Sequence, residues 1–477
     1  MIVLILGLFA VHLRHAALVH LNPDEALHYQ LAHQQSLHDA YLANNTNAHP
    51  PLLILAVHLW IKIAAAEWFL RLIPVLAYCG MVWFGFAWGR LALGNVAAVA
   101  MAAVLALAPP VFNLAVELRH YTLALCFSMG ALYFLERAFA EKSRRSMALS
   151  SMMLYLAILS HYSVLWFALG LGLYALFRIC RRELPRRPAI IWAAGQSGAI
   201  LLYGFLYLTH IRHLKDTGMA AEARAGWLRT HYFLPGDDLL EFLGRNTVDL
   251  FQYLFGSDFA AWIGVLLIAI GIALLVAGKG PPARPLLLAM GGTFLGWWAA
   301  AGMGLYPYGG TRHSIILLTW LAVAIAVAAN ALLRERPMLA GALILAAGCL
   351  WRASVIPETS VYPVAEQRRE FPVKAMEYLR SRVPAGGLVF VDYQSALLLC
   401  YYLDPRKYCV NTSGGHFWNY GMDSMRVAVS QKWSLDASEF ARELQELKRE
   451  YSLGRGAEVW VFDGGWGSPV NRMLQIQ

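Results

Sequence analysis

The chain has 477 residues, of which 58% are hydrophobic and only 14% are charged, a balance far from that of an average soluble domain. Apolar windows of about 20 residues, long enough to cross roughly 30 Å of hydrocarbon, recur along it. This composition excludes a soluble protein and favours a polytopic α-helical membrane protein. The net charge of +9 is therefore attributed to cytoplasmic loops, and no nucleic-acid partner is expected.

The predicted spans begin at the N-terminus. The first apolar run, Met1 to Val19, lacks a charged segment before it and is interpreted as a retained span rather than a cleaved signal. The stretch Met147 to Phe177 is divided into two short spans by Ser160-His161-Tyr162. About eleven spans are expected, each assigned from hydrophobicity with boundaries uncertain by a few residues. They lie near 2–19, 67–89, 96–112, 121–137, 147–160, 163–177, 189–209, 259–277, 285–304, 313–333 and 338–351.

Lysine and arginine are concentrated in alternate short loops, which the positive-inside rule places in the cytoplasm. These loops include Arg90, Arg144, Arg181, Lys279 and Arg334. With an odd number of spans, the N-terminus is then cytoplasmic and the C-terminal region is extracytoplasmic.

Two long outer segments interrupt the spans. The first runs from His20 to about Glu67 and contains an apolar stretch, Leu52 to Ala66, that is too short to cross a membrane. This segment is expected to form helices lying along the membrane interface. The other, from about His210 to Ser257, is rich in charged and aromatic residues and is interpreted as a lid or an acceptor cleft.

After Arg352 the composition becomes that of a soluble domain, in which short β-type runs alternate with amphipathic helices. These elements are expected at 371–382, 388–391, 438–451 and 459–462. The chain is therefore divided into a transmembrane catalytic domain, 1–351, and a small extracytoplasmic α/β domain, 352–477. Because that compartment is oxidising, Cys400 and Cys409 are predicted to form a disulfide.

Asp24 and Glu25 follow the first span by about five residues, and carboxylates near lipid are costly and usually functional. Asp24 is expected to be the catalytic base, with Glu25 orienting the acceptor. The simpler alternative for Asp24 is a helix N-cap. A metal site combining this pair with His28 and His49 is considered, but the spacing matches no metal signature. No metal ligand is assigned, and a divalent metal cofactor is not favoured.

Four further polar motifs lie at span ends that the predicted topology places on the same outer side. They are His49-Pro50-Pro51, Glu117-Leu118-Arg119-His120-Tyr121, His161-Tyr162, and the segment from Tyr306 to Arg312-His313. Scattered structural charges would have no reason to choose one face. A carboxylate that accepts a hydroxyl proton, together with arginines that neutralise a phosphate, suits group transfer from a lipid-phosphate carrier.

The roles expected of these residues fall into two groups. Contacts to the donor phosphate are assigned to Arg119, Tyr121, Arg312 and His313, and contacts to substrate are assigned to His49, His161 and Tyr162. Simpler alternatives stay open, because an arginine at a span end can snorkel to the headgroups and a tyrosine there can belong to an aromatic belt.

The order of these five motifs resembles the GT-C superfamily, specifically the family 39 type of protein O-mannosyltransferases and lipid A aminoarabinose transferases. The resemblance covers roughly residues 1–350. It implies a polyprenyl-phosphate-linked sugar donor, inverting transfer on the extracytoplasmic face, and an acidic catalytic residue in the first outer loop. Asp24-Glu25 departs from an Asp-x-Asp motif, which argues against a bound divalent metal.

The sequence thus predicts an inverting glycosyltransferase of a bacterial inner membrane, whose acceptor is a lipid, a glycan or a protein. One alternative is a lipid-linked-sugar transporter or flippase, which predicts polar residues through the depth of the bilayer and internally repeated halves. Neither feature is seen. Another alternative is a non-catalytic protein of envelope assembly. A variant that lacks Asp24 and still functions would favour this alternative.

Overall fold

A computed structural model describes residues 1–214, 223–256, 258–278, 282–336, 368–405, 416–422, 424–454 and 456–465, with isolated positions between 338 and 348. The chain divides into two compact units. The first unit contains Met1–Leu13, Asn45–Leu53 and Arg71–Ile356, and the second contains Arg14–Asn44, Ile54–Leu70 and Pro357–Gln477. The second unit thus takes two segments of the first long loop in addition to the C-terminal region.

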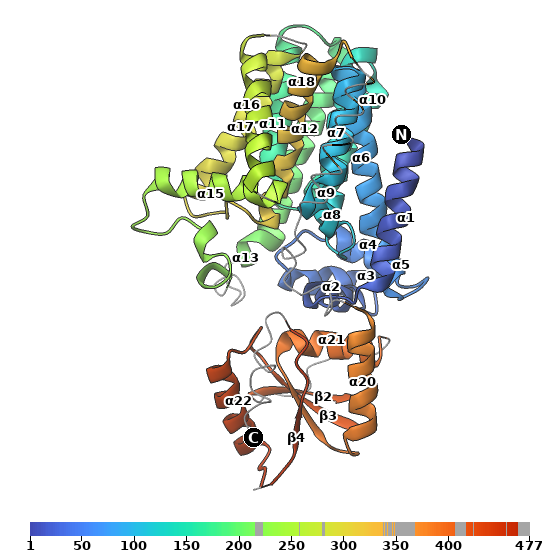
Figure 1. Ribbon diagram of the computed structural model, residues 1–477, viewed down its shortest axis with the longest axis vertical. Coiled ribbons are helices and arrows are strands. Elements are labelled where there is room, and N and C mark those ends of the chain that lie inside the picture. Colours follow the sequence, from blue (N-terminus) through green and yellow to red (C-terminus); the bar gives the residue numbers. More distant parts are fainter. Residues whose placement is uncertain are drawn as a thin grey trace. The chain divides into compact units, whose positions relative to one another are not determined.

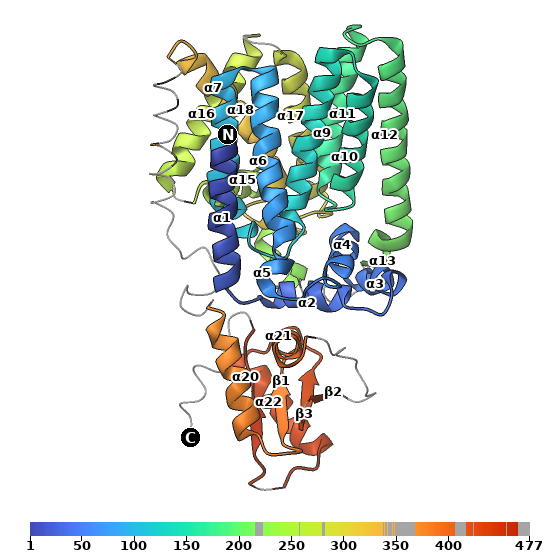
Figure 2. The same ribbon diagram turned by 90° about the vertical axis from the view of Figure 1, so that its right-hand side faces the viewer.

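The first unit is a bundle of helices (Figures 1 and 2). Its long helices are α1 (Ile2–Leu18), α6 (Leu72–Ala92), α7 (Asn95–Leu107), α9 (Tyr121–Glu141), α10 (Arg144–Ile158), α11 (Val164–Cys180), α12 (Arg186–Leu206), α15 (Leu239–Phe255), α16 (Asp258–Val276), α17 (Ala283–Gly302) and α18 (Leu318–Leu333). Shorter pieces are α8 (Pro109–Leu114), η2 (Tyr207–Ile211), α13 (Arg212–Leu214), η3 (Arg229–His231) and η4 (Arg312–Leu317).

Each predicted span before residue 334 contains a helix, and the last one, 338–351, lies largely outside the described residues. Within the described part, five stretches are long and apolar enough to cross a membrane. They are Glu67–Ala92, Tyr121–Glu141, Arg186–Leu214, Phe259–Val276 and Arg312–Leu333. The division of Met147 to Phe177 into two helices is confirmed, because α10 ends at Ile158 and α11 begins at Val164.

Glycines allow neighbouring helices of the bundle to approach closely. A Cβ atom at Gly170 of α11 would lie 2.4 Å from the carbonyl oxygen of Ala289 in α17, and one at Gly271 of α16 would lie 2.1 Å from that of Ala324 in α18. Small residues at such crossings are typical of membrane helices, which gain stability from backbone proximity rather than from a hydrophobic difference with lipid. These glycines therefore bring α17 and α18 against their neighbours.

One buried ionic network joins α9 to α11. Arg178 Nη1 donates to both carboxylate oxygens of Glu136, at 2.8 and 3.0 Å, and to the hydroxyl of Tyr174 at 2.8 Å. Its Nε donates to Glu183 at 2.7 Å. Because Glu136 and Arg178 are each at most 9% exposed, removing one partner would leave a buried charge poorly compensated.

We expect Glu136→Ala to lower the free energy of unfolding by about 3 kcal/mol, the low end for a broken buried pair because Glu183 remains. The matched control is Glu141→Ala, also on α9, which removes a solvent-exposed pair with Arg137. That change should cost less than about 1 kcal/mol. Unfolding of both purified variants in detergent would measure the difference, and equal losses would show that the network adds no stability.

The second unit contains a four-stranded sheet in the order β2-β3-β1-β4. Its strands are β1 (Leu388–Val391), β2 (Phe417–Met422), β3 (Met425–Ser430) and β4 (Val459–Val461). β1 runs parallel to both β3 and β4, and β2 is antiparallel to β3. The helices are α20 (Glu370–Arg382), α21 (Tyr393–Leu403) and α22 (Ala437–Glu450). This arrangement agrees with the expected small α/β domain.

The two faces of the sheet are covered by different helices. Val389 and Val391 of β1 pack with Met376 of α20 and Leu397 of α21, whereas Phe390 packs on the opposite face with α22. The alternation follows from the two-residue period of a strand, and burial on both faces explains the continuous apolar run of β1.

Segments of the first long loop pack against this domain within the second unit. They form α2 (Pro23–Ala32), α3 (Leu37–Ala43), most of α4 (Leu52–Trp60) and α5 (Glu67–Leu70), while η1 (Asn44–Thr46) lies largely in the first unit. The Tyr29 hydroxyl donates to the carbonyl of Pro405 at 2.7 Å, and the Tyr401 hydroxyl donates to that of Ala65 at 2.8 Å. Cys400 is disulfide-bonded, but Cys409 lies outside the described residues, so the predicted pairing of the two stays a prediction.

Candidate functional site

Asp24 and Glu25 occupy the first turn of α2 in the second unit, and they differ in burial. Asn22, not Asp24, is the N-cap: its side chain accepts the backbone N–H of Glu25 at 3.0 Å. The Glu25 carboxylate accepts the backbone N–H of Asn22 at 3.0 Å, which completes a capping box. The alternative role of Asp24 as the cap is thus wrong. Asp24 is half-buried, whereas Glu25 is only 1% exposed.

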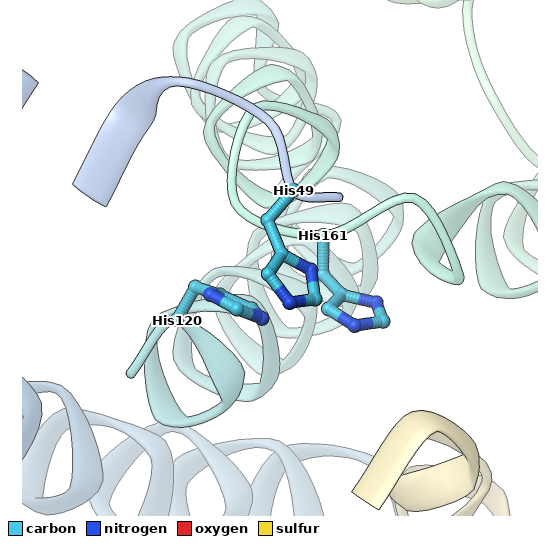
Figure 3. Close-up of side chains that lie close together, drawn as sticks. All are labelled: His49, His120 and His161. Atoms are coloured by element: carbon cyan, nitrogen blue, oxygen red, sulfur yellow. The ribbon is translucent and has the colours of Figure 1, made fainter. Parts of the chain in front are cut away.

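The first unit brings His49, His120 and His161 together, from three separate segments (Figure 3). The ring centroids of His49 and His120 are 3.6 Å apart, and those of His120 and His161 are 5.1 Å apart. All three side chains are buried. His313 lies at the edge of this group, with its ring 6.2 Å from that of His161. This set of four is called the histidine cluster below.

Local chain geometry explains why these histidines lie at helix ends. His49 precedes Pro50 and Pro51, and the backbone N–H of Leu52 donates to the carbonyl of Leu159, which ties this segment to the end of α10 at 3.1 Å. His120 is the N-cap residue of α9. His161 lies in the turn between α10 and α11, where its carbonyl accepts the N–H of Val164 at 3.2 Å.

Two arginines lie beside the histidine cluster. Arg119 is 5% exposed, its Nη2 lies 3.4 Å from the Tyr121 hydroxyl, and its guanidinium carbon is 5.5 Å from the centre of that ring. Arg312 begins η4 and is half-buried. Both guanidinium groups are close enough to His313 to act on it electrostatically. Arg119, Tyr121, Arg312 and His313, which were predicted together to contact the donor phosphate, therefore lie in one positively charged region.

His161 is held neutral by its surroundings. Burial, reinforced by the positive charge of Arg119, lowers the pKa of His161 to about 3. Its Nδ1 lies 2.6 Å from the hydroxyl of Ser163 and 3.1 Å from the backbone nitrogen of that residue. At neutral pH this imidazole can donate one hydrogen bond and accept another, or it can bind a metal. It does not add positive charge to the region.

Tyr162 links the turn between α10 and α11 to two other segments. Its hydroxyl is hydrogen-bonded to Nδ1 of His210, and Nε2 of that histidine donates to the carbonyl of Asn47 at 2.8 Å. The carbonyl of Tyr162 accepts the hydroxyl of Tyr203 at 2.8 Å. Tyr162 therefore has a structural role in addition to the predicted contact with substrate.

The predicted site residues are thus divided between the two units. Those of the first unit lie in one polar region, and Asp24 and Glu25 are neighbours on α2 of the second. The sequence predictions omitted His120, His210 and Ser163 from the site. His120 stands inside a recognised motif, so a signal was present, whereas no local pattern separated His210 from other interfacial histidines.

Comparison with known proteins gives two findings. Residues 48–207, about a third of the chain, match the family model described as dolichyl-phosphate-mannose-protein mannosyltransferase. The fold is similar to that of ArnT from Cupriavidus metallidurans bound to undecaprenyl phosphate, with a TM-score of 0.51, 15% identity and 84% of each chain covered. The chain has the GT-C fold.

Two further GT-C structures are more distant. ArnT in the apo state has a TM-score of 0.48 and 14% identity over 84% of each chain. The Archaeoglobus fulgidus oligosaccharyltransferase in complex with Zn and sulfate has a TM-score of 0.45 and 13% identity, over 80% of this chain and 57% of that one. No curated protein matches this chain by sequence.

We expect Tyr162→Phe to lower the free energy of unfolding by about 1 kcal/mol, because the change removes one hydrogen bond to His210 and keeps the ring. The control is Tyr207→Phe, on η2, whose side chain is 50% exposed. Thermal unfolding of the purified proteins in detergent provides the measurement. A Tyr162→Phe protein as stable as wild type would contradict the structural role.

Proposed function

We propose that this chain is an integral membrane glycosyltransferase that moves a sugar from a polyprenyl-phosphate-linked donor to an acceptor hydroxyl, with inversion at the anomeric carbon. The GT-C fold, the match to a mannosyltransferase family model and the apolar helices support this proposal. The observation that carries it furthest is the convergence of Arg119 and Arg312 on one polar region of the first unit.

The two arginines suit binding of a phosphate. A guanidinium stays protonated at any physiological pH and presents several N–H donors in a plane, so it can form paired hydrogen bonds with phosphate oxygens. A lipid tail needs no soluble nucleotide-binding fold, because it remains in the bilayer beside the apolar helices. The similar ArnT structure is itself bound to a lipid phosphate, undecaprenyl phosphate.

The proposed reaction is a single displacement. The acceptor hydroxyl oxygen attacks the anomeric carbon, the bond from that carbon to the phosphate oxygen breaks, and polyprenyl phosphate leaves with the bonding electron pair. The acceptor proton passes to the carboxylate of Asp24. Arg119 and Arg312 stabilise the negative charge that develops on the leaving phosphate, as preorganised donors do in other enzymes.

The structure favours Asp24 over Glu25 as the base. Glu25 already accepts a hydrogen bond within the capping box and is almost fully buried, so its carboxylate is committed to starting α2. Asp24 is the more accessible of the two and is not the cap. We assign the base to Asp24 and give Glu25 the role of holding the first turn of α2 in place.

The proposed location is a bacterial inner membrane, with the N-terminus in the cytoplasm. The reaction and the C-terminal domain are placed on the extracytoplasmic side. The distribution of arginine among the short loops supports this orientation, because positively charged loops are retained in the cytoplasm. The acceptor is a lipid, a glycan or a protein of the cell envelope. Analysis of envelope glycolipids and glycoproteins in a deletion strain would identify it by the sugar that disappears.

Arg312→Ala is expected to weaken binding of the polyprenyl-phosphate donor by about 10- to 100-fold, the value of one or two charge-assisted hydrogen bonds. Arg312→Lys should recover part of that loss, because it keeps the charge and loses the planar fork. The matched control is Arg334→Ala, an exposed arginine at the opposite end of α18. Donor binding by the purified proteins distinguishes them, and unchanged binding in Arg312→Ala would remove this residue from the proposal.

Asp24→Asn is expected to reduce transfer of a labelled sugar by on the order of 10²- to 10⁴-fold, the usual span for general acid–base groups. Because Asn22 caps α2, the substitution removes a charge and leaves the cap unchanged. Donor binding and the yield of folded protein should stay as in wild type.

Asp39→Asn is the control for Asp24→Asn, since Asp39 is another acidic residue in the first turn of a helix from the same loop. It should transfer sugar at close to the wild-type rate. A folded Asp24→Asn protein with the rate of wild type would exclude Asp24 as the base.

A further inference from the structure

His49, His120 and His161 form a group of side chains that could hold a metal ion. Each offers one ring nitrogen, and the three nitrogens lie within 4.8 Å of one another (Figure 3). The residues come from the segment before Pro50, from the N-cap of α9 and from the turn between α10 and α11. Three separate segments thus bring one imidazole each into the same small region of the first unit.

A second observation concerns His161 alone. This side chain is 2% exposed, and its Nε2 has no hydrogen-bond partner among the described residues. A buried polar atom without a partner is costly and in native proteins usually has a ligand or a functional role. Nδ1 of the same ring lies 2.6 Å from the Ser163 hydroxyl. Metal binding through Nε2 requires the tautomer that carries its proton on Nδ1, where it is donated to the Ser163 hydroxyl in place of the 3.1 Å contact from the backbone N–H of that residue.

We propose that His49, His120 and His161 bind one divalent metal ion of the zinc class. Three neutral imidazoles are the ligand set of zinc and related transition metals, whereas magnesium and calcium prefer oxygen ligands. With metal–nitrogen bonds of about 2.0–2.1 Å, tetrahedral ligand nitrogens lie about 3.3 Å apart. Because the nitrogens lie within 4.8 Å of one another, the widest pair would have to close by at most roughly 1.5 Å on binding.

The bound metal would connect three loops of the first unit and leave a fourth position open. Arg119 acts electrostatically on His161, so its positive charge opposes a cation here. An anionic oxygen ligand in the fourth position would offset that repulsion. The chemical class of that ligand is a water-derived hydroxide or a phosphate oxygen. The metal site is tested by binding alone, and its failure would leave the proposed sugar transfer untouched.

The experiment uses full-length protein purified in detergent without a polyhistidine tag and stripped with a chelator. Zn²⁺ is added, the protein is desalted, and metal is counted per chain. We expect about one ion per chain, as for a single site with three protein ligands. Co²⁺ in place of Zn²⁺ should give the visible absorption bands of a four-coordinate ion.

Three variants assign that ion to the cluster. His120→Ala should lose both the retained metal and the Co²⁺ bands, and His120→Cys should restore binding because a thiolate is also a zinc ligand. His38→Ala, which removes an exposed histidine, should bind as wild type does. Wild-type protein that retains no Zn²⁺, or a folded His120→Ala protein that retains as much, would overturn the proposal.

Ser163→Ala supplies a test that keeps all three ligands. Partners that orient a ligating histidine typically contribute 10- to 100-fold to metal affinity. We therefore expect Ser163→Ala to weaken Zn²⁺ binding by about that factor. The matched control is Ser160→Ala, in the same turn, whose hydroxyl donates to the carbonyl of Leu156 at 2.7 Å. Equal Zn²⁺ affinity in Ser163→Ala and Ser160→Ala would contradict the orientation assigned to His161.

Discussion

The interior of an apolar helical bundle has no water to satisfy polar groups, and the distribution of polar side chains in the first unit follows from this constraint. Backbone polar groups are paired within the helices, and side-chain polarity is tolerated only where another group of the protein compensates it. The histidine cluster, Arg119 and Arg312 accordingly lie in loops or at the first residues of helices. The proposed reactive centre thus lies at helix ends.

The absence of water inside the bundle also explains why the buried charges between α9 and α11 are paired with one another. Arg178 is matched by Glu136, Glu183 and the Tyr174 hydroxyl, so that its donors are largely used within the protein. Acidic partners in direct contact thus identify Arg178 as a structural arginine. Arg119 and Arg312 instead act on the buried His161 and the half-buried His313, a combination of cations and neutral rings that suits an anionic ligand.

In the second unit, one loop is held by two kinds of interaction. A capping box starts α2 at Asn22 and Glu25, while hydrogen bonds from Tyr29 and Tyr401 join the loop to the C-terminal domain. The acidic residue proposed as the base is therefore carried by a helix whose start and flank are both held in place. A general base needs such support, because proton transfer depends on distances of a few tenths of an ångström.

The sequence by itself determined the helices of the bundle, the division at the turn containing His161, the small α/β domain and the polar motifs at span ends. Hydrophobic runs and strand alternation are local properties, so the residues that encode them are neighbours in the chain. Tertiary structure decided that Tyr162 binds His210 and that His120 joins His49 and His161. These contacts depend on how loops far apart in sequence are brought together by helix packing, which no local pattern records.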